Sequence, residues 1–600
     1  SKSRKLGMPE MIRKKFKINI LMLALTRLFK WGAGELLVIL GLLVLINNYL
    51  LYEKVTIRAD GEGYYDYLPA LFIYGDFPKE NSNGTSIYSD RIKQLGFYLD
   101  VDGSKLNKYP AGAAVLVLPF FNYAHLTARL QGFENDGFSL PYQEAMFYAA
   151  VFYLFLALIF LRRLLSLFNL SWPIVFIVQL LAVFSTSIIN YVNYDPTFSH
   201  VYSFFAVTAF LFFTKSWFLT QKTGHFLWAA TFLGLIIILR QINVIVILFI
   251  PFLAGSPGNL KKGIITVFKH KPALVAGSLI LLSIVSIQLL LWYHQTGNLF
   301  VYSYKNEGFN FLSPAFYSIL FSYRKGLFVY TPIAFLSLIG LLIFIKNKQY
   351  YLLWSWLLFF VIFTYIVSSW HSWVYGCSYG SRVYIDFYAI FMVLLGILFE
   401  GMKRWAKALV ILVSLLTIPL NIIQTKQYKE FILHWDQMNK DSYWTYFLRT
   451  EKKFKGLLFK RTYSFNDQTT EIVHSVSLPN VVAEPNTITG LYSEFSRQIA
   501  KFQDVNIIQV VFDNDFQLKQ DARMELNVRD SLTNEAYYFH NHAFIHFIEN
   551  GLNRWQTGMF NYEFAPIRTE NNCKINLLIF TEDKPVEFTN LKINYLVYRQ

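Results

Sequence analysis

The stretch ALVAGSLILLSIVSIQLLLWY occupies residues 273–293 and contains no charged side chain. A helix of this length rises about 30 Å, which matches the hydrocarbon thickness of a bilayer. Inside a bilayer every backbone N–H and C=O must be paired within the protein, and a helix achieves this within one segment. The stretch therefore predicts a transmembrane helix.

Comparable apolar runs recur along the first two thirds of the chain. We predict roughly eleven transmembrane helices, on the criterion of length and hydropathy, at residues 33–52, 141–161, 172–190, 200–219, 226–239, 241–254, 273–293, 328–345, 350–368, 383–399 and 406–423. A further apolar stretch at 111–127 follows Pro110, and we expect it to be juxtamembrane or re-entrant. Only 16% of the residues are charged, against about 25% in soluble proteins.

Basic residues predict the orientation of these helices. With the N-terminus inside, the short inner loops hold most of the loop Lys and Arg, as the positive-inside rule requires. Residues 1–32 are basic and amphipathic, which indicates a cytoplasmic interfacial segment. The long first outer loop then covers residues 53–140, and the chain after 424 lies outside. The polar clusters all fall on the outer face under this assignment.

Residues 425–600 form a second domain of different composition. Alternating runs broken by Asn, Asp and Gly appear at residues 506–512, 523–528, 536–540, 574–580 and 591–598. Period-two alternation with turn residues between the runs predicts an antiparallel β-sandwich. The fold class is therefore a polytopic α-helical membrane domain at 33–424 followed by an extracytoplasmic β-rich domain at 425–600.

The formal net charge of +16 suggests an anionic partner, either nucleic acid or the membrane surface. No groove-reading motif accompanies this charge, so we expect no nucleic acid. The positive-inside bias and attraction to anionic membrane lipid explain it more simply. Two cysteines, Cys377 and Cys573, do not make a disulfide framework or a zinc site.

An acidic and aromatic stretch, RADGEGYYDYLPAL, follows the first predicted span at residues 58–71. Asp60, Glu62 and Asp66 are candidate catalytic carboxylates, because a partly buried carboxylate beside aromatic rings can act as a general base. Tyr64 and Tyr65 are candidates for contact with substrate. A solvated acidic loop within an interfacial aromatic belt is the alternative interpretation.

Two other outer segments carry polar residues at helix starts. The run NKYPAGAAVLVLPFF at 107–121 places Lys108 before a turn, where it can bind a lipid phosphate or simply snorkel. The run NYDPTFSHVYS at 193–203 holds Asp195 and His200, both candidates for binding substrate. A helix N-cap beside Pro196 accounts for Asp195 but not for His200.

The last cluster is WHSWVYGCSYGSRVYID at residues 370–386. A cation at a helix start suits a phosphate group, which makes Arg382 a candidate for the donor phosphate. Arg240, in the hairpin between two short spans, is another. The remaining candidates surround these cations. The aromatic and imidazole side chains proposed to bind substrate are Trp370, His371, Trp373 and Tyr379, and the weaker cationic candidates are Lys305, Arg324 and Lys325.

The order of these motifs resembles the GT-C superfamily of membrane glycosyltransferases. Relatives in that superfamily include protein O-mannosyltransferases and lipid A aminoarabinose transferases. The similarity is greatest to bacterial members, and it rests on DGEGYYDYL at 60–68, PAGAAVLVLPFF at 110–121 and WVYGCSYGSR at 373–382. It covers about residues 30–425.

The resemblance implies inverting transfer of a sugar from a polyprenyl-phosphate carrier, at the outer face of a bacterial cytoplasmic (inner) membrane. It implies that Asp60 is the base and that Lys108 and Arg382 hold the donor phosphate. The adjacent acidic pair usual in the family is absent, since Gly61 separates Asp60 from Glu62. The choice among Asp60, Glu62 and Asp66 therefore stays open.

Other points also stay open from the sequence. The acceptor is a glycan, a lipid or a protein, and use of a divalent cation is undecided. An O-antigen ligase or polymerase shares this topology and substrate class. A flippase or transporter of a lipid-linked sugar predicts polar clusters on both faces. A non-catalytic envelope scaffold predicts that the outer loops tolerate replacement of the candidate residues.

Overall fold

The computed structural model describes residues 32–75, 77, 97–101, 104–304, 307–436, 438–451, 454, 470–485, 487–499, 502–505, 507–515, 522–532, 536–543, 555–563, 572–581 and 585–598. The predicted interfacial segment, apart from Gly32, lies outside these residues, as does Lys305. The chain divides into two compact units, Ser1–Thr425 and Lys426–Gln600. Each has its own hydrophobic core.

The N-terminal unit is helical, with one small hairpin of β1 (Tyr98–Val101) and β2 (Ser104–Asn107). Its helices are α2 (Ala33–Leu45), η1 (Ile46–Leu50), α3 (Asp60–Tyr65), α4 (Tyr67–Phe72), α6 (Gly112–Gln131), α7 (Leu140–Ser166), α8 (Trp172–Phe184), α9 (Ile188–Asn193), α10 (His200–Thr220), α11 (Thr223–Leu239), η2 (Gln241–Phe249), α12 (Ile250–Ala254), α13 (Pro257–Lys269), α14 (Lys271–Thr296), α15 (Phe316–Phe321), α16 (Leu327–Tyr330), α17 (Pro332–Leu338), α18 (Leu341–Lys346), α19 (Tyr350–Ser368), η3 (Arg382–Phe387), α20 (Tyr388–Gly401) and α21 (Arg404–Lys429).

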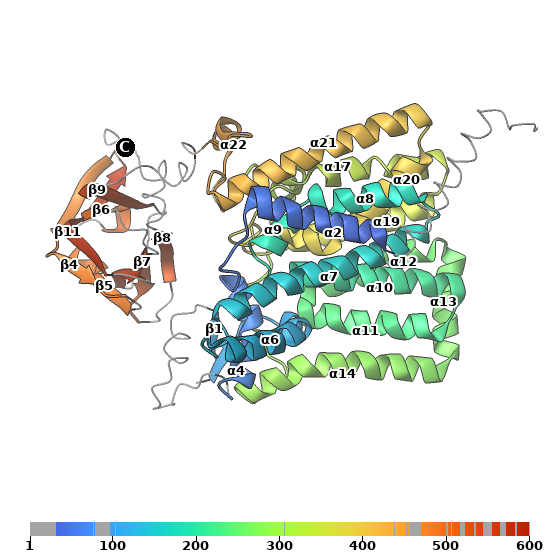
Figure 1. The fold of residues 1–600 in the computed structure, drawn as a ribbon, viewed down its shortest axis with the longest axis horizontal. Coiled ribbons are helices and arrows are strands. Elements are labelled where there is room, and N and C mark those ends of the chain that lie inside the picture. The colour runs from blue at the N-terminus through green and yellow to red at the C-terminus, as the bar shows by residue number, and fades with distance from the viewer. Residues whose placement is uncertain are drawn as a thin grey trace, which may run out of the picture. The chain divides into compact units, whose positions relative to one another are not determined.

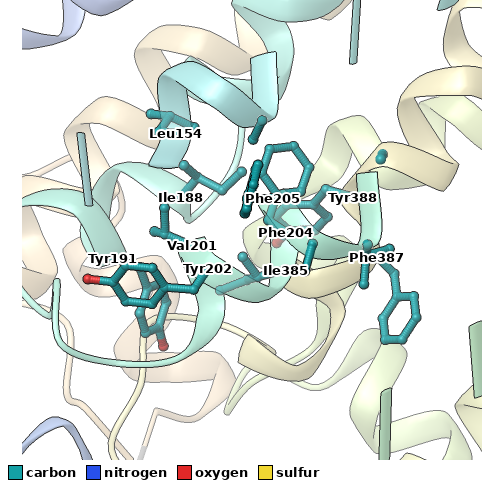
Figure 2. Close-up of a cluster of buried hydrophobic side chains, with 14 of the residues drawn as sticks. Leu154, Ile188, Tyr191, Val201, Tyr202, Phe204, Phe205, Ile385, Phe387 and Tyr388 are labelled. Atoms are coloured by element: carbon teal, nitrogen blue, oxygen red, sulfur yellow. The ribbon is translucent and has the colours of Figure 1, made fainter. Parts of the chain in front are cut away.

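Neighbouring helices of this unit pack side by side in a layer. In Figure 1 α7, α10, α11 and α14 run roughly parallel, and each contacts the next in that order. Helix α2 packs on α7 and α8, and α20 packs on α8 and α17. The buried side chains between α7, α9, α10 and the η3–α20 segment are largely aromatic, as Figure 2 shows for Tyr191, Phe204 and Phe387. Helix α10 and η3, which begin at His200 and Arg382, therefore share a rigid core.

Helix lengths confirm a multi-pass α-helical membrane protein. Within the described part of the chain, eight helices are long and apolar enough to cross a bilayer, and a ninth is counted if one strongly bent pair is taken as a single span. Three predicted spans correspond to shorter apolar helices, Trp172–Phe184, Thr223–Leu239 and Pro332–Lys346.

The structure adds detail to two predicted segments. Residues 111–127, expected to be juxtamembrane or re-entrant, belong to the continuous 20-residue helix α6, which contains Pro119 and meets the length and composition criterion for a span. The predicted span 241–254 is not one α-helix but the nine-residue 3-10 helix η2 followed by the short α12. Runs of 3-10 helix this long are uncommon, and within a helical segment they often mark a hinge or a strained sequence.

The C-terminal unit is a sandwich of two antiparallel sheets. Its strands are β3 (Thr470–Ser477), β4 (Val481–Ala483), β5 (Thr487–Phe495), β6 (Ile507–Asp515), β7 (Ala522–Asp530), β8 (Ala536–Ala543), β9 (Trp555–Glu563), β10 (Cys573–Thr581) and β11 (Val586–Tyr598). One sheet has the order β5-β10-β7-β8, and the other has β3-β11-β6-β9 with β4 beside β11. Side chains from both sheets form one core. The described residues of all five predicted runs lie in strands. The sequence did not predict β3, β5 and β9, which contain Gly or several polar residues, nor β4, which has three residues.

Candidate active site

Asp60 and Arg382 meet although they are 322 positions apart in the chain. Arg382 Nη2 donates to Asp60 Oδ2 at 2.5 Å, and the side chains are 13% and 29% exposed, respectively. Burial raises the pKa of the Asp60 carboxyl, but the Arg382 charge, a hydrogen bond from Tyr109 and the Lys108 charge outweigh it, so the pKa lies below its ordinary value. Asp60 is therefore an ionised carboxylate at neutral pH, beside two cations.

Two glycines allow α3 to carry Asp60 into this position. A Cβ on Gly61 would lie 2.0 Å from Thr197 Oγ1, and a Cβ on Gly63 would lie 2.2 Å from Tyr109 Cδ2. Real Cβ atoms do not approach this closely, so any other residue would push α3 away from its neighbours. The D-G-E-G spacing thus reflects packing on both sides of the helix that begins at Asp60.

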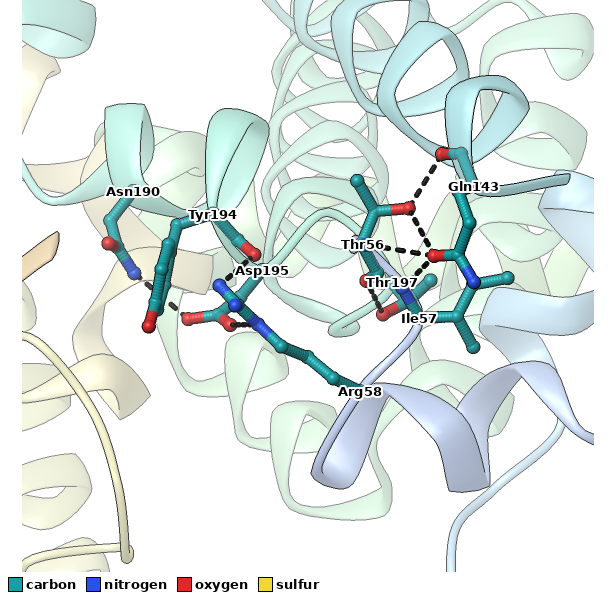
Figure 3. A network of polar contacts seen from close by, with 8 residues as sticks. All are labelled: Thr56, Ile57, Arg58, Gln143, Asn190, Tyr194, Asp195 and Thr197. Atoms are coloured by element: carbon teal, nitrogen blue, oxygen red, sulfur yellow. Dashed lines mark hydrogen bonds and ion pairs between the residues drawn. The ribbon is translucent and has the colours of Figure 1, made fainter. Parts of the chain in front are cut away.

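Arg58 anchors the chain just before Asp60. Its Nε donates to Asp195 Oδ1 at 3.2 Å, its Nη2 donates to the Tyr194 carbonyl at 2.5 Å, and its guanidinium carbon lies 3.3 Å from the centre of the Tyr194 ring. Asn190 Nδ2 donates to the other Asp195 oxygen at 3.1 Å. Figure 3 shows this arrangement. Asp195 is thus a partner of Arg58, and Ser199 is the N-cap residue of α10.

A second set of bonds holds the same segment from its other side. The backbone N–H groups of Thr56 and Ile57 both donate to Gln143 Oε1 at 2.8 Å, and Thr56 Oγ1 donates to the Gln143 carbonyl at 2.6 Å. Thr197 Oγ1 donates to the Thr56 carbonyl at 2.9 Å (Figure 3). Between these anchors and α3 lies Ala59, at φ 50° and ψ −136°. This left-handed conformation strains a residue with a Cβ.

Lys108, which follows Asp60 in the sequence, contacts residues of a distant loop. Its Nζ forms an ion pair with Glu307 Oε1 and lies 5.1 Å from the centre of the Tyr304 ring. Its backbone carbonyl accepts a hydrogen bond from Ser303 Oγ at 2.9 Å. The candidate phosphate-binding lysine thus already contacts a carboxylate of the 302–311 segment.

Arg240 and His200 meet in a buried cluster around Asp386. His200 Nδ1 lies 2.8 Å from Asp386 Oδ1, and Asn243 Nδ2 donates to Asp386 Oδ2 at 2.7 Å. Arg240 Nε lies 3.7 Å from the same oxygen. Arg240 Nη1 is 3.2 Å from His200 Nε2, so a neutral His200 that donates from Nδ1 can accept from Arg240. The charge of Asp386, which is fully buried, is balanced within the cluster.

Asp386 and Asn243 were not among the candidates from the sequence. Asp386 closes the predicted 370–386 cluster, and an acidic residue within a 20-residue apolar run is a signal of function in itself. Asn243 gives only a weak signal, because a lone amide in an apolar segment is common. The structure connects both to Arg240, which was a candidate.

Some predicted residues have structural partners instead of an open position. Asp66 is buried and accepts a hydrogen bond from the Tyr98 hydroxyl. The Tyr65 hydroxyl donates to the Gly137 carbonyl at 2.5 Å. Tyr379 is fully buried, with its hydroxyl 3.1 Å from Asn421 Oδ1, which leaves its ring no exposed face for a sugar. Asp66 and Tyr65 likewise hold α3 and α4 in place.

The other aromatic candidates surround the 302–311 segment. Trp370 packs edge-on against Phe309 at 4.9 Å and Tyr304 at 5.4 Å between ring centres. The backbone N–H of exposed His371 donates to the Gly308 carbonyl at 2.9 Å. Trp373 is half-buried and packs against the main core. Trp370 is thereby linked to Tyr304, and through it to Lys108.

Three further candidates lie near or behind this site. Tyr64 is buried, with its ring 4.7 Å from that of Tyr109, and Glu62 is half-buried in α3. Lys325, expected on an anion-binding surface, is almost fully buried and donates to Ser378 Oγ at 2.9 Å. Lys325 therefore fixes the loop that leads to Arg382. Among the described residues, no three His, Cys, Asp or Glu side chains are grouped to hold a metal ion.

Comparison with known proteins gives distant structural likeness alone. No family model and no curated protein matches the chain. The solved structure of arabinosyltransferase EmbB from Mycobacterium smegmatis aligns with 95% of this chain at a TM-score of 0.40 and 8% sequence identity. The alignment covers 65% of the EmbB chain, so this chain spans less than two thirds of that protein. At this distance the likeness carries no inference about chemistry, which depends on the site itself.

Proposed function

We propose that the chain is a glycosyltransferase that moves a sugar from a polyprenyl-phosphate donor to an acceptor hydroxyl at the outer face of a bacterial cytoplasmic membrane. The observation that supports this most directly is the Asp60–Arg382 contact, with the Lys108 charge also acting on Asp60. A carboxylate beside cations provides both groups that such a transfer needs. The carboxylate handles the acceptor proton, and the cations handle the leaving phosphate.

The reaction is a single displacement. The acceptor oxygen attacks the anomeric carbon as the bond from that carbon to the phosphate oxygen breaks, which inverts the configuration. The acceptor proton moves to Asp60, and the charge that develops on the polyprenyl phosphate is stabilised by Arg382, Lys108 and Arg240. No step is assigned to a divalent cation.

Donor binding also makes Asp60 a better base. In the structure Arg382 neutralises Asp60 and lowers its pKa. A donor phosphate that binds Arg382 shares this positive charge, so the proton affinity of Asp60 rises. Asp60 is thus a weak base in the donor-free protein and a stronger base once the donor is bound. The acceptor hydroxyl is therefore deprotonated only when a donor sugar is in place.

The test uses the purified protein in lipid nanodiscs with a panel of polyprenyl-phosphate sugars and with glycan, lipid and peptide acceptors. Mass spectrometry should show an acceptor heavier by one sugar, together with free polyprenyl phosphate. Asp60→Asn should abolish transfer, whereas Glu134→Gln should not, because Glu134 is an exposed acidic residue in the α6–α7 loop. Transfer by Asp60→Asn at the wild-type rate would contradict the assignment.

A lipid-linked sugar transporter is the second candidate, because the helix around Arg240 is broken at a buried charge cluster. Helix α11 ends at Leu239, and the chain continues as the 3-10 helix η2. Discontinuous helices with charged ends are typical of transporter sites. The same nanodisc assay separates the two functions, because a transporter leaves the sugar attached to its lipid.

A further inference from the structure

The four cations around the candidate site are each paired with a carboxylate. The pairs are Arg58–Asp195, Arg240–Asp386, Arg382–Asp60 and Lys108–Glu307. The charges of these eight side chains cancel. A phosphate that shares a cation leaves the ion pair in place, whereas a phosphate that takes over a cation must replace its carboxylate.

Two of the carboxylates cannot be exchanged cheaply. Asp386 has no solvent exposure and also binds His200 and Asn243. Asp195 is buried and also accepts from Asn190. Removing either one would leave a half-buried cation without its partner, which is strongly unfavourable.

Glu307 differs from these two in its surroundings. Its side chain is 34% exposed, the largest value among the four carboxylates. A carboxylate that already contacts water loses little hydration energy to its ion pair and regains it on release. Asp60 is nearly as exposed, but the proposed reaction needs it in place. Glu307 is therefore the carboxylate whose exchange costs least.

Hydrogen bonds and a ring contact surround the Lys108–Glu307 ion pair. The Ser303 hydroxyl donates to the Lys108 carbonyl at 2.9 Å, and the Tyr302 hydroxyl donates to the Glu307 carbonyl at 2.6 Å. The Tyr304 ring lies beneath the Lys108 ammonium. Tyr302 and Ser303, which both precede Glu307 in the sequence, thus bond to the Glu307 and Lys108 backbones, and the Glu307 carboxylate itself forms the ion pair with Lys108.

We propose that the Glu307 carboxylate is a built-in competitor of the donor phosphate, which occupies Lys108 until a phosphate group displaces it. This inference rests on the proposed function, because it assigns the Lys108 site to the donor phosphate. On displacement Lys108 exchanges one anion for another, and Glu307 returns to water. The exchange makes donor binding weaker than the cations alone would allow, and it does not involve the chemical step.

The test measures binding of farnesyl phosphate, a short prenyl phosphate, to the full-length protein in nanodiscs. Farnesol and inorganic phosphate serve as comparison ligands, to separate the contributions of the lipid and the phosphate. Exposed ion pairs contribute little, so Glu307→Gln should lower the Kd for farnesyl phosphate by roughly two- to fivefold. The variant should lower KM for the sugar donor similarly and leave kcat unchanged. A role of Glu307 in folding alone would not tighten binding.

Matched variants separate charge competition from loop anchoring. Ser303→Ala removes an anchor without changing charge and should leave the Kd within twofold, and Glu134→Gln removes an exposed negative charge elsewhere and should do the same. Lys108→Gln should weaken binding, and Glu307→Gln should then have no effect in that background. Glu307→Ala repeats the charge removal with a smaller side chain.

The possible outcomes distinguish failure of the competitor role from failure of the proposed function. If the wild-type protein binds farnesyl phosphate through Lys108 but Glu307→Gln leaves the Kd unchanged or raises it, the competitor role is wrong and the proposed function stands. If Lys108→Gln binds as tightly as wild type, the competitor role is also wrong. If the wild-type protein neither binds prenyl phosphates nor transfers sugar from them, the proposed function itself is wrong.

Discussion

Arg382 Nη2 lies 2.5 Å from Asp60 Oδ2, so a residue at the start of η3 sets the charge state of a residue at the start of α3. The pair joins two loops that the sequence separates by 322 positions. Neither loop contains a complete site. Because the two residues are so far apart in the chain, the sequence identifies each of them as a candidate but does not show that they form a pair.

The pH dependence of transfer should follow this pair. The pKa of Asp60 in the donor-free protein lies below its ordinary value of 3.8, so wild-type kcat/KM, which reports the free protein, should fall only when the pH drops below that value. Arg382→Gln removes the cation, so the acid limb should move to higher pH, and kcat should fall by roughly 10²- to 10³-fold. A pH–rate profile of both proteins checks this. An acid limb at the same pH in both proteins would show that Arg382 does not lower the pKa of the catalytic carboxylate.

The same shift has a consequence for stability. A carboxyl group whose folded pKa is lowered stabilises the protein at pH above its unfolded pKa, and the contribution disappears as the pH falls through the folded pKa. The melting temperature of Asp60→Asn should therefore be lower than that of wild type at neutral pH, and the difference should shrink under acid conditions. Melting curves at several pH values measure it.

Gly61→Ala tests the packing of α3. Its Cβ would lie 2.0 Å from Thr197 Oγ1, so α3 must shift, and overpacking of this kind costs about 1–3 kcal/mol. Because the shift moves Asp60, transfer should fall much more than stability. Gly224→Ala is the matched control, since a Cβ there meets nothing within 4 Å. Wild-type transfer by Gly61→Ala would show that α3 is not held closely.

Asp386→Ala tests the buried cluster. It leaves Arg240 and His200 without the carboxylate that both contact, and an uncompensated buried charge costs about 3–5 kcal/mol. The melting temperature should fall strongly. Asp386→Asn retains the shape and one acceptor oxygen, so it should lose less stability while it still impairs donor affinity through Arg240. Equal stability of both variants and wild type would contradict the charge balance of the cluster.

The membrane domain was largely predictable because hydropathy reports directly on burial in lipid. Long apolar runs such as 273–293 lie in helices long enough to span a bilayer. Hydropathy does not distinguish an α-helix from a 3-10 helix, so it missed η2 after Arg240. Hydropathy also does not show that residues 111–127 belong to one continuous helix of 20 residues with Pro119 inside it.

The candidate site was predictable residue by residue but not as pairs. Asp60, Lys108 and Arg382 stand out because charged residues beside apolar helices are costly. Glu307, the counterion of Lys108, stands out less, because an acidic residue in a polar loop has no distinctive pattern. Asp386, the counterion of Arg240, lies in an apolar run and does carry a signal. Pairing depends on the tertiary fold, and so does the difference between Tyr379, which is fully buried, and Trp370, which is partly exposed.

Ala59→Gly tests whether the strained backbone before Asp60 is part of the site. Ala59 has φ 50° and ψ −136°, a conformation that costs roughly 1–3 kcal/mol for a residue with a Cβ and little for glycine. If the Arg58 and Gln143 contacts alone fix the segment, the glycine variant should be at least as stable as wild type and should transfer sugar within about twofold of it. Ala59→Val should lower both stability and transfer, because a branched Cβ makes the same conformation more costly. Melting temperatures and initial rates measure these effects. A stable glycine variant with greatly reduced transfer would show instead that the Ala59 side chain itself helps to orient the Asp60 carboxylate.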